Sequence, residues 1–143
     1  MPKAAELMAG ALAALGLSRG FVVHGSDGLD EITTTGPTLV FEIRDGKVER
    51  RTLEPADFGV RTAVPGDLKG GDQRRNAAIA NAVLEGQRGP HRDIVLANAA
   101  AALVAAGRVP TFLEGVAIAA VSIDAGAARG KVEALARFTP SGA

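Results

Sequence analysis

Residues 21–33, FVVHGSDGLDEIT, decide the fold and the chemistry of this 143-residue chain. The first four residues form a short apolar run that is typical of a buried strand, and a glycine-punctuated acidic loop follows them. In a parallel α/β sheet, ligands gather at the loops that follow the carboxyl ends of the strands. The stretch therefore predicts a strand whose end presents the carboxylates of Asp27, Asp30 and Glu31.

Periodic patterns on both sides of this stretch predict the other elements. Residues 38–43 and 47–53 form a hairpin around Asp45-Gly46, a turn dipeptide with a strong hairpin preference. Caps, glycine stops and apolar periodicity predict helices over residues 1–15, 72–84, 90–106, 111–125 and 127–138. We expect an α/β domain with a small mixed sheet flanked by about five helices, in which residues 1–143 form one unit.

Two of these helices carry more specific expectations. The first shows an apolar stripe through Leu7, Ala11 and Leu15, which predicts that these side chains cover the core. In the helix over residues 90–106, the stretch 94–106 has almost no polar face, so we expect this helix to lie at the centre of the domain.

Composition excludes several classes of protein. Lys plus Arg and Asp plus Glu each total 16, so the chain offers no basic field for nucleic acid or an anionic membrane. Cysteine is absent, which excludes disulfides and cysteine-ligated zinc, and there are only two histidines. No apolar run is long enough to cross a bilayer, and we expect residues 1–15 to form an amphipathic helix and not a secretory signal. We expect a cytoplasmic protein that binds neither nucleic acid nor membrane.

Asp30 and Glu31 are the candidate metal ligands. Mg²⁺ prefers hard oxygen ligands, and it commonly takes one or two carboxylates while water or substrate phosphates fill its other positions. Acidic residues in a glycine-rich loop are also typical of a solvated surface, so this pair alone does not establish a metal site.

The wider context strengthens the assignment. Residues 22–33 resemble the VVHGxDGLDEIT segment of the anthranilate phosphoribosyltransferases, enzymes of tryptophan biosynthesis. Further segments resemble the same family in the same order along nearly the whole chain. They are PADFG at 55–59, LKGGD at 68–72, Asn76-Ala77, DIVLANAA at 93–100, EGV at 114–116 and DAGAA at 124–128.

The resemblance implies a reaction and a cofactor. Family enzymes transfer the phosphoribosyl group from phosphoribosyl diphosphate to anthranilate and use Mg²⁺. We also expect a homo-oligomer, namely a homodimer. By resemblance, Asp30 and Glu31 bind the magnesium that accompanies the diphosphate, with Glu31 bridging two ions and Asp30 serving one. Metal ions at the leaving diphosphate lower the barrier because negative charge builds up there. The resemblance assigns no catalytic acid or base within this sequence.

Two family segments find no match in these 143 residues: the GTGGD phosphate loop and a KHGN-type segment, both from the family's N-terminal part. We therefore expect residues 1–143 to correspond to the C-terminal portion and to have little activity in isolation. Gly70-Gly71-Asp72 aligns with a different family segment and lacks the preceding Gly-Thr. It predicts a helix start with Asp72 as N-cap.

Alternatives remain open at this point. The chain can be a non-catalytic, truncated or split module that associates with itself or with a complementing chain. It can also be another phosphoribosyl- or nucleoside-transferring enzyme of the same fold, although the DGLDE segment favours the anthranilate enzyme. His24 is expected to hold loop backbone and not to act as a general base, and His91, Arg74 and Arg75 are expected to face solvent.

Overall fold

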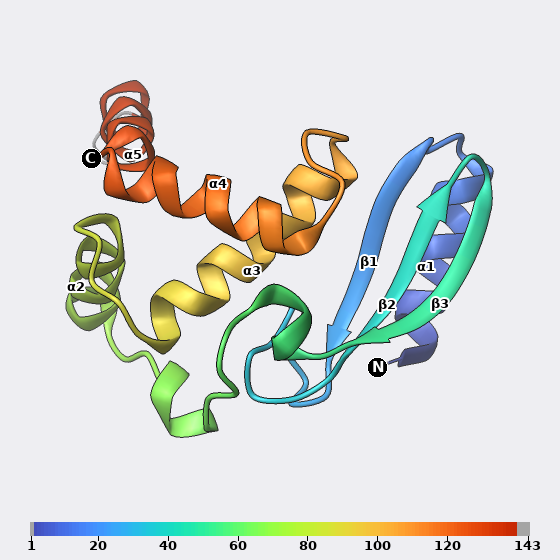
Figure 1. The fold of residues 1–143 in the computed structure, drawn as a ribbon, viewed down its shortest axis with the longest axis horizontal. Coiled ribbons are helices and arrows are strands. Elements are labelled where there is room, and N and C mark those ends of the chain that lie inside the picture. The colour runs from blue at the N-terminus through green and yellow to red at the C-terminus, as the bar shows by residue number, and fades with distance from the viewer. Residues whose placement is uncertain (1, 140–143) are drawn as a thin grey trace.

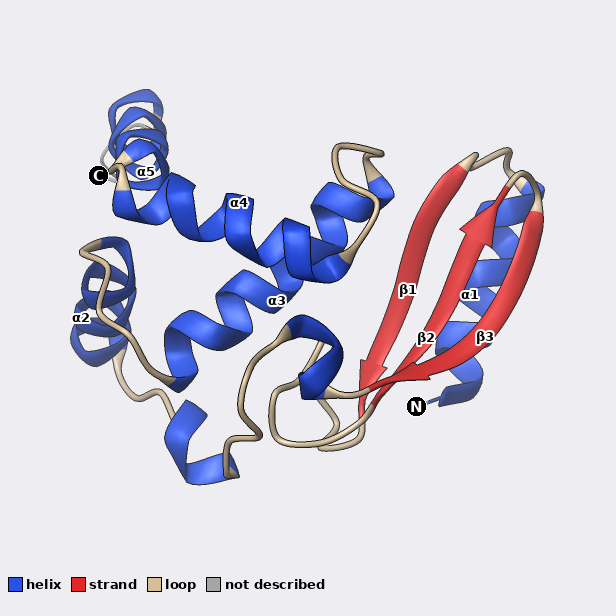
Figure 2. Cartoon of the chain, viewed as in Figure 1, coloured by secondary structure: helices blue, strands red, loops and turns tan. Residues whose placement is uncertain are grey.

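A computed structural model describes residues 2–139 as a three-stranded sheet beside a group of helices (Figures 1 and 2). The elements in chain order are α1 (Pro2–Ala14), β1 (Arg19–Gly25), β2 (Thr38–Arg44), β3 (Lys47–Leu53), the short 3₁₀ helices η1 (Pro55–Phe58) and η2 (Pro65–Leu68), α2 (Gln73–Leu84), α3 (Pro90–Ala105), α4 (Phe112–Asp124) and α5 (Ala127–Phe138). No helix among these residues is both long and apolar enough to cross a membrane.

Within residues 2–139 the α/β class and the five α-helices are confirmed, but the sheet differs from the mixed sheet that was expected. Within residues 2–139 its strands lie in the order β1-β2-β3 and every pairing is antiparallel. The reason lies in the connections, because parallel neighbours need a long crossover, usually a helix. Here Asp45-Gly46 closes a two-residue turn with both φ angles positive, and the loop 26–37 returns the chain directly from β1 to β2.

Helix α1 covers one face of the sheet, but with a different side from the one its sequence suggested. Ala5 and Ala9 are buried against β1 and β2, where they join a cluster with Phe41. Leu7 and Leu15, from the expected stripe, are 67% and 84% exposed. The small alanine side chains let the helix axis lie close to the sheet, and the larger side chains are turned outward.

Helix α3 lies at the centre of the molecule, as its apolar sequence predicted. Ala97 and Ala100 are fully buried and pack in one cluster with Val40 of the sheet and with Phe58 of η1. The ring of Phe112, at the start of α4, stacks 4.8 Å from the ring of Phe58 between centroids. The sheet, η1, α3 and α4 therefore contribute to one core cluster, while α1 packs in a separate cluster with β1 and β2.

An ion pair between a buried arginine and an exposed aspartate joins α3 to α4. Arg92, on the first turn of α3, is buried, and its guanidinium donates two hydrogen bonds of 2.7 and 2.9 Å to the carboxylate of Asp124. Paired donors of this kind match a carboxylate in both spacing and direction. The contact joins the start of α3 to the end of α4.

The closest approach of α3 and α4 gives the first testable prediction. A methyl group added at Gly115 would lie 2.8 Å from both Cα and Cβ of Ala100, so Gly115→Ala should overpack the contact and cost about 1–3 kcal/mol. Gly130, inside α5, faces open space, and Gly130→Ala should gain up to about 1 kcal/mol of helix propensity. Urea unfolding measures both variants. Equal midpoints for Gly115→Ala and the wild type would contradict the close helix contact.

Candidate functional site

The acidic loop lies between β1 and β2, at the end of the sheet opposite the Asp45-Gly46 turn (Figure 1). Gly25, the last residue of β1, pairs with Thr38, the first residue of β2. Residues 26–37 therefore form a loop whose two ends lie next to each other in the sheet. Asp30 and Glu31 lie near its middle and are exposed. The structure thus places both predicted metal ligands side by side in the chain, on the loop that follows β1.

Asp27 organises the first half of this loop. One carboxylate oxygen accepts the backbone N–H of Leu29 at 3.1 Å, and the other accepts the hydroxyls of Thr33 and Thr35 at 2.5 and 2.6 Å. Both oxygens of Asp27 are therefore engaged within the loop. Sequence reasoning grouped Asp27 with the other two carboxylates, whereas its geometry makes it a structural anchor.

Asn98 of α3 holds the second half. Its side-chain amide accepts the N–H of Ile32 and donates to the C=O of Ile32, both at 2.9 Å. A further bond of 3.0 Å joins the same amide nitrogen to the C=O of Ile94. Sequence reasoning missed this residue as a loop contact. The available signal was a single amide within the otherwise apolar stretch 94–106.

The electrostatics divide the loop carboxylates into two kinds. Burial acts to raise the pKa of Asp27, but the hydrogen bonds from Thr33, Thr35 and Leu29 outweigh it and leave the pKa below its ordinary value. Burial, followed by the negative charges of Asp30 and Asp27, raises the pKa of Glu31. Hydrogen-bond donors of the loop thus stabilise the ionised form of Asp27, whereas burial and the neighbouring carboxylates disfavour the ionised form of Glu31.

Asp30 and Glu31 fit the ligand chemistry of Mg²⁺ in number and type. Neither carboxylate enters a salt bridge or a side-chain hydrogen bond within residues 2–139, so their oxygens can accept a cation. The same residues contain no group of three or more His, Cys, Asp or Glu side chains that could hold a metal ion. The pair therefore forms a partial site, of the kind that Mg²⁺ completes with water or substrate phosphates.

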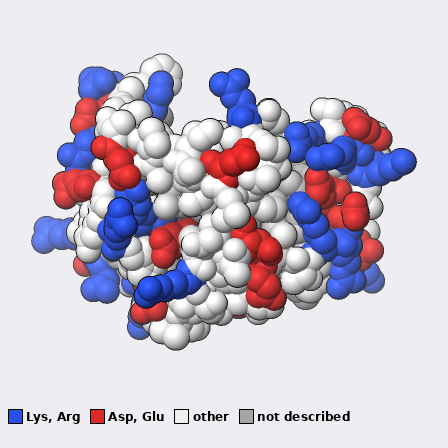
Figure 3. All heavy atoms as spheres, in the orientation of Figure 1, with Lys and Arg blue, Asp and Glu red and all other residues white. Residues whose placement is uncertain are grey.

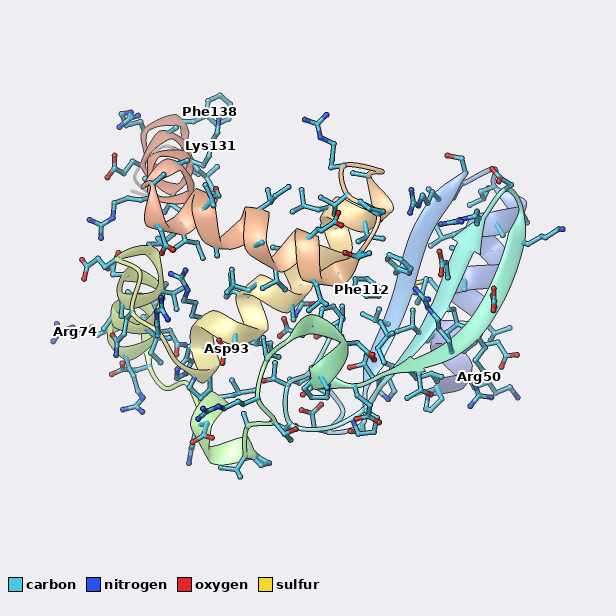
Figure 4. The ribbon with its side chains drawn as sticks, viewed as in Figure 1. Arg50, Arg74, Asp93, Phe112, Lys131 and Phe138 are labelled. Carbon is cyan, nitrogen blue, oxygen red and sulfur yellow. The ribbon has the colours of Figure 1, made fainter. Side chains whose placement is uncertain are left out.

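The remaining sequence candidates lie outside this loop chemistry. Arg74 extends from α2 away from the body of the molecule (Figure 4), which agrees with the solvent-facing role expected for it. Asp72 caps α2 by accepting the N–H of Arg75 at 2.8 Å, so the Gly70-Gly71-Asp72 segment is a helix start, as expected. The expected backbone contact of His24 stays a prediction.

Asp93, on the first turn of α3, is a perturbed carboxylate that sequence reasoning did not single out (Figure 4). Burial raises the pKa of Asp93, and the guanidinium groups of Arg92 and Arg61 act in the opposite direction. Its charged neighbours are cations and not the loop carboxylates, so we leave it outside the candidate site.

Comparison with known proteins identifies the family. The family described as "Glycosyl transferase family, a/b domain" matches residues 1–129. The chain belongs to this glycosyl transferase family. Within it, the sequence groups with the anthranilate phosphoribosyltransferases: it is 75% identical to that of Solibacter usitatus over 138 residues, which are 96% of this chain and 41% of the relative. The Pelotomaculum thermopropionicum enzyme is 52% identical over 96% of this chain and 40% of its own length.

Solved structures of the same family agree with this grouping. Anthranilate phosphoribosyltransferase from Thermus thermophilus superimposes with a TM-score of 0.85 at 39% identity, over 96% of this chain and 40% of that one. The Saccharomyces cerevisiae enzyme in complex with PRPP and Mg gives a TM-score of 0.73 at 29% identity, over 80% of this chain and 33% of that one. This glycosyl transferase chain thus spans about 40% of the length of its closely matching relatives.

Replacing Asp27 tests the anchor in this glycosyl transferase loop. Asp27→Asn removes one of two accepting oxygens, and it should cost about 1 kcal/mol at neutral pH, a low figure because the carboxylate is exposed. Because folding lowers this pKa, the stabilisation is present above the ordinary value of 3.8 and is lost as the pH falls through the lower folded value. Urea unfolding at pH about 7, 5 and 3 measures it. A difference between wild type and variant that grows at the lowest pH would contradict the anchor.

Proposed function

We propose that residues 1–143 form the C-terminal α/β portion of an anthranilate phosphoribosyltransferase, and that the complete enzyme transfers the phosphoribosyl group to anthranilate in tryptophan biosynthesis. The observation that carries the proposal is 75% identity with such an enzyme over 96% of this chain. Because the chain spans 41% of that relative, we propose no turnover by these 143 residues alone. A cytoplasmic location follows from the proposed biosynthetic role.

We assign the metal ligands of the proposed enzyme to Asp30 and Glu31. The assignment is supported by their free carboxylate oxygens on an otherwise internally bonded loop, and by the yeast relative, which was solved in complex with PRPP and Mg. Mg²⁺ bound there would neutralise charge on the diphosphate as its bond to the anomeric carbon breaks. Asp30 and Glu31 would supply negative oxygen ligands, and Asp27 would keep the loop that bears them in shape.

A calorimetric titration tests this assignment. The chain should bind phosphoribosyl diphosphate only when Mg²⁺ is present, and Asp30→Asn/Glu31→Gln should abolish the binding because both metal ligands lose their charge. Asp45→Asn/Glu133→Gln removes the same number of charges at the hairpin turn and on α5, so it serves as the matched control and should bind like the wild type.

Three results would contradict different parts of the proposal. Binding that survives Asp30→Asn/Glu31→Gln would refute the assigned ligands while leaving the family chemistry intact. Absence of Mg²⁺-dependent binding by the wild type would refute a metal site preformed in this portion. Turnover of anthranilate by the 143 residues would refute their proposed dependence on the remainder of the enzyme.

A second candidate function is a non-catalytic module that associates with itself, as a dimer or larger oligomer, or with a complementing chain. The observation that favours it is exposed apolar surface on several helices, since soluble monomers rarely expose large contiguous apolar patches. On α5, Val132, Leu135 and Phe138 follow one another at intervals of three residues, and all are exposed. On the face drawn in Figure 3, Lys and Arg side chains gather toward the two ends, and the centre is mostly uncharged with several Asp and Glu side chains.

Sedimentation velocity tests this second candidate. The apolar side chains should drive association, so the mean sedimentation coefficient of the wild type should rise with protein concentration. Leu135→Glu should weaken the association by placing a charge within the exposed apolar row on α5. A single monomeric species over the whole concentration range would refute self-association.

A further inference from the structure

Asn98 makes a two-point contact with a single residue of the acidic loop. Its amide oxygen accepts from Ile32 N–H and its amide nitrogen donates to Ile32 C=O, in the manner of a paired residue in an antiparallel ladder. The third bond, to Ile94 C=O one turn earlier, orients the amide on α3. Two bonds to one residue fix its orientation as well as its position.

Ile32 transmits this hold to Glu31, its immediate neighbour. The Ile32 side chain is 2% exposed and packs in the core cluster with Ala97 and Ala100 of α3. The Ile32 nitrogen that bonds to Asn98 belongs to the peptide group that joins Glu31 to Ile32. Because the Glu31 carboxylate has no partner of its own within residues 2–139, its placement depends on the backbone that carries it.

Asp27 provides the corresponding hold on the other side of the pair. It binds Leu29 N–H directly before Asp30, and it binds two threonine hydroxyls after Glu31. The Asp30-Glu31 pair thus lies between two sets of hydrogen bonds, one made by Asp27 within the loop and one made by Asn98 of α3. Within residues 2–139, only the Asn98 contact joins the loop to a helix through side-chain hydrogen bonds. Its two partners, Ile32 and Asn98, lie 66 positions apart in the sequence.

We propose that Asn98 is a positioning residue for the magnesium–diphosphate site, which it serves by fixing the Glu31–Ile32 peptide group. This role rests on the proposed function, since it acts through the metal ligands assigned there. Groups that orient metal ligands from behind typically contribute about 10–100-fold to metal affinity. The position of Asn98 on a buried helix suits that task, because rigid elements hold ligands more precisely than loops do.

The test measures ligand binding and the hydrogen exchange of the loop amides in two Asn98 variants and one control variant. Asn98→Ala removes all three bonds, and Asn98→Leu also removes them while retaining most of the side-chain volume, which guards against simple cavity effects. Val104→Ala serves as the control because Val104 is a buried residue of the same helix, further along the chain from the loop contact. The thermal unfolding midpoint of each variant is measured first, so that differences in binding can be separated from differences in overall stability.

Both Asn98 variants should weaken Mg²⁺-dependent binding of phosphoribosyl diphosphate by about tenfold or more in calorimetry. Hydrogen exchange at Ile32 and in the preceding loop should accelerate relative to the rest of the chain. Val104→Ala should bind like the wild type, and its loop exchange should change no more than that of its other amides. A residue that acted only through global stability would give the same binding and exchange pattern in all three variants.

Other outcomes separate the positioning role from the proposed function. Wild-type binding with equal affinity in Asn98→Ala and Asn98→Leu would overturn the positioning role alone. Unchanged exchange at Ile32 in both variants would also overturn it, because the hydrogen bonds would then not hold the loop. If the wild type itself fails to bind, the proposed metal site fails and the positioning role fails with it.

Discussion

The close packing of an alanine-rich helix, α3, is the constraint on which the other elements depend. Ala97 and Ala100 are fully buried, and the position opposite Ala100 on α4 is Gly115, where even a methyl group finds no space. Large side chains at these positions would force the helices apart, since buried cores tolerate little added volume. Because the side chains of α3 at these contacts are small, buried residues of the sheet, η1 and α4 can all pack against α3.

Proximity to α3 also makes the acidic loop part of the fold. A twelve-residue connection such as 26–37 has the length of a mobile loop, yet its middle is bonded to a central helix and its Ile32 side chain is buried. The charge of Asp27 is directed at donors within the loop, which leaves Asp30 and Glu31 as the exposed acidic groups without such partners. Among the acidic residues of this loop, Asp27 thus stabilises the loop structure, while Asp30 and Glu31 remain available for the candidate chemistry.

Local signals in the sequence predicted most of the elements, because those signals act over a few residues. The Asp45-Gly46 turn, the Asp72 cap and the glycine stops each formed as expected. The antiparallel sheet and the buried face of α1 were not predicted, since they depend on which surfaces meet in three dimensions. A helix that shows two apolar sides, Leu7 on one and Ala9 on another, does not reveal which of them the sheet selects.

The candidate site divides in the same way. The metal-ligand pair was inferred from a contiguous motif, whereas the contact between Asn98 and Ile32 joins residues 66 apart and has no local pattern. The supporting threonines, Thr33 and Thr35, likewise carried no signal in the sequence, and their role became visible only when both hydroxyls converged on one oxygen of Asp27.

The electrostatics of the loop supply a further argument for a cation. Glu31 lies close to two other carboxylates, and both burial and those charges oppose its ionised form. A purely structural loop would be more stable with a neutral residue at that position, because like charges repel and nothing within residues 2–139 compensates Glu31. Local arrangements that cost stability are typical of functional sites. Mg²⁺ held by Asp30 and Glu31 would offset this repulsion by its attraction to both carboxylates, which agrees with the metal-binding role proposed for the pair.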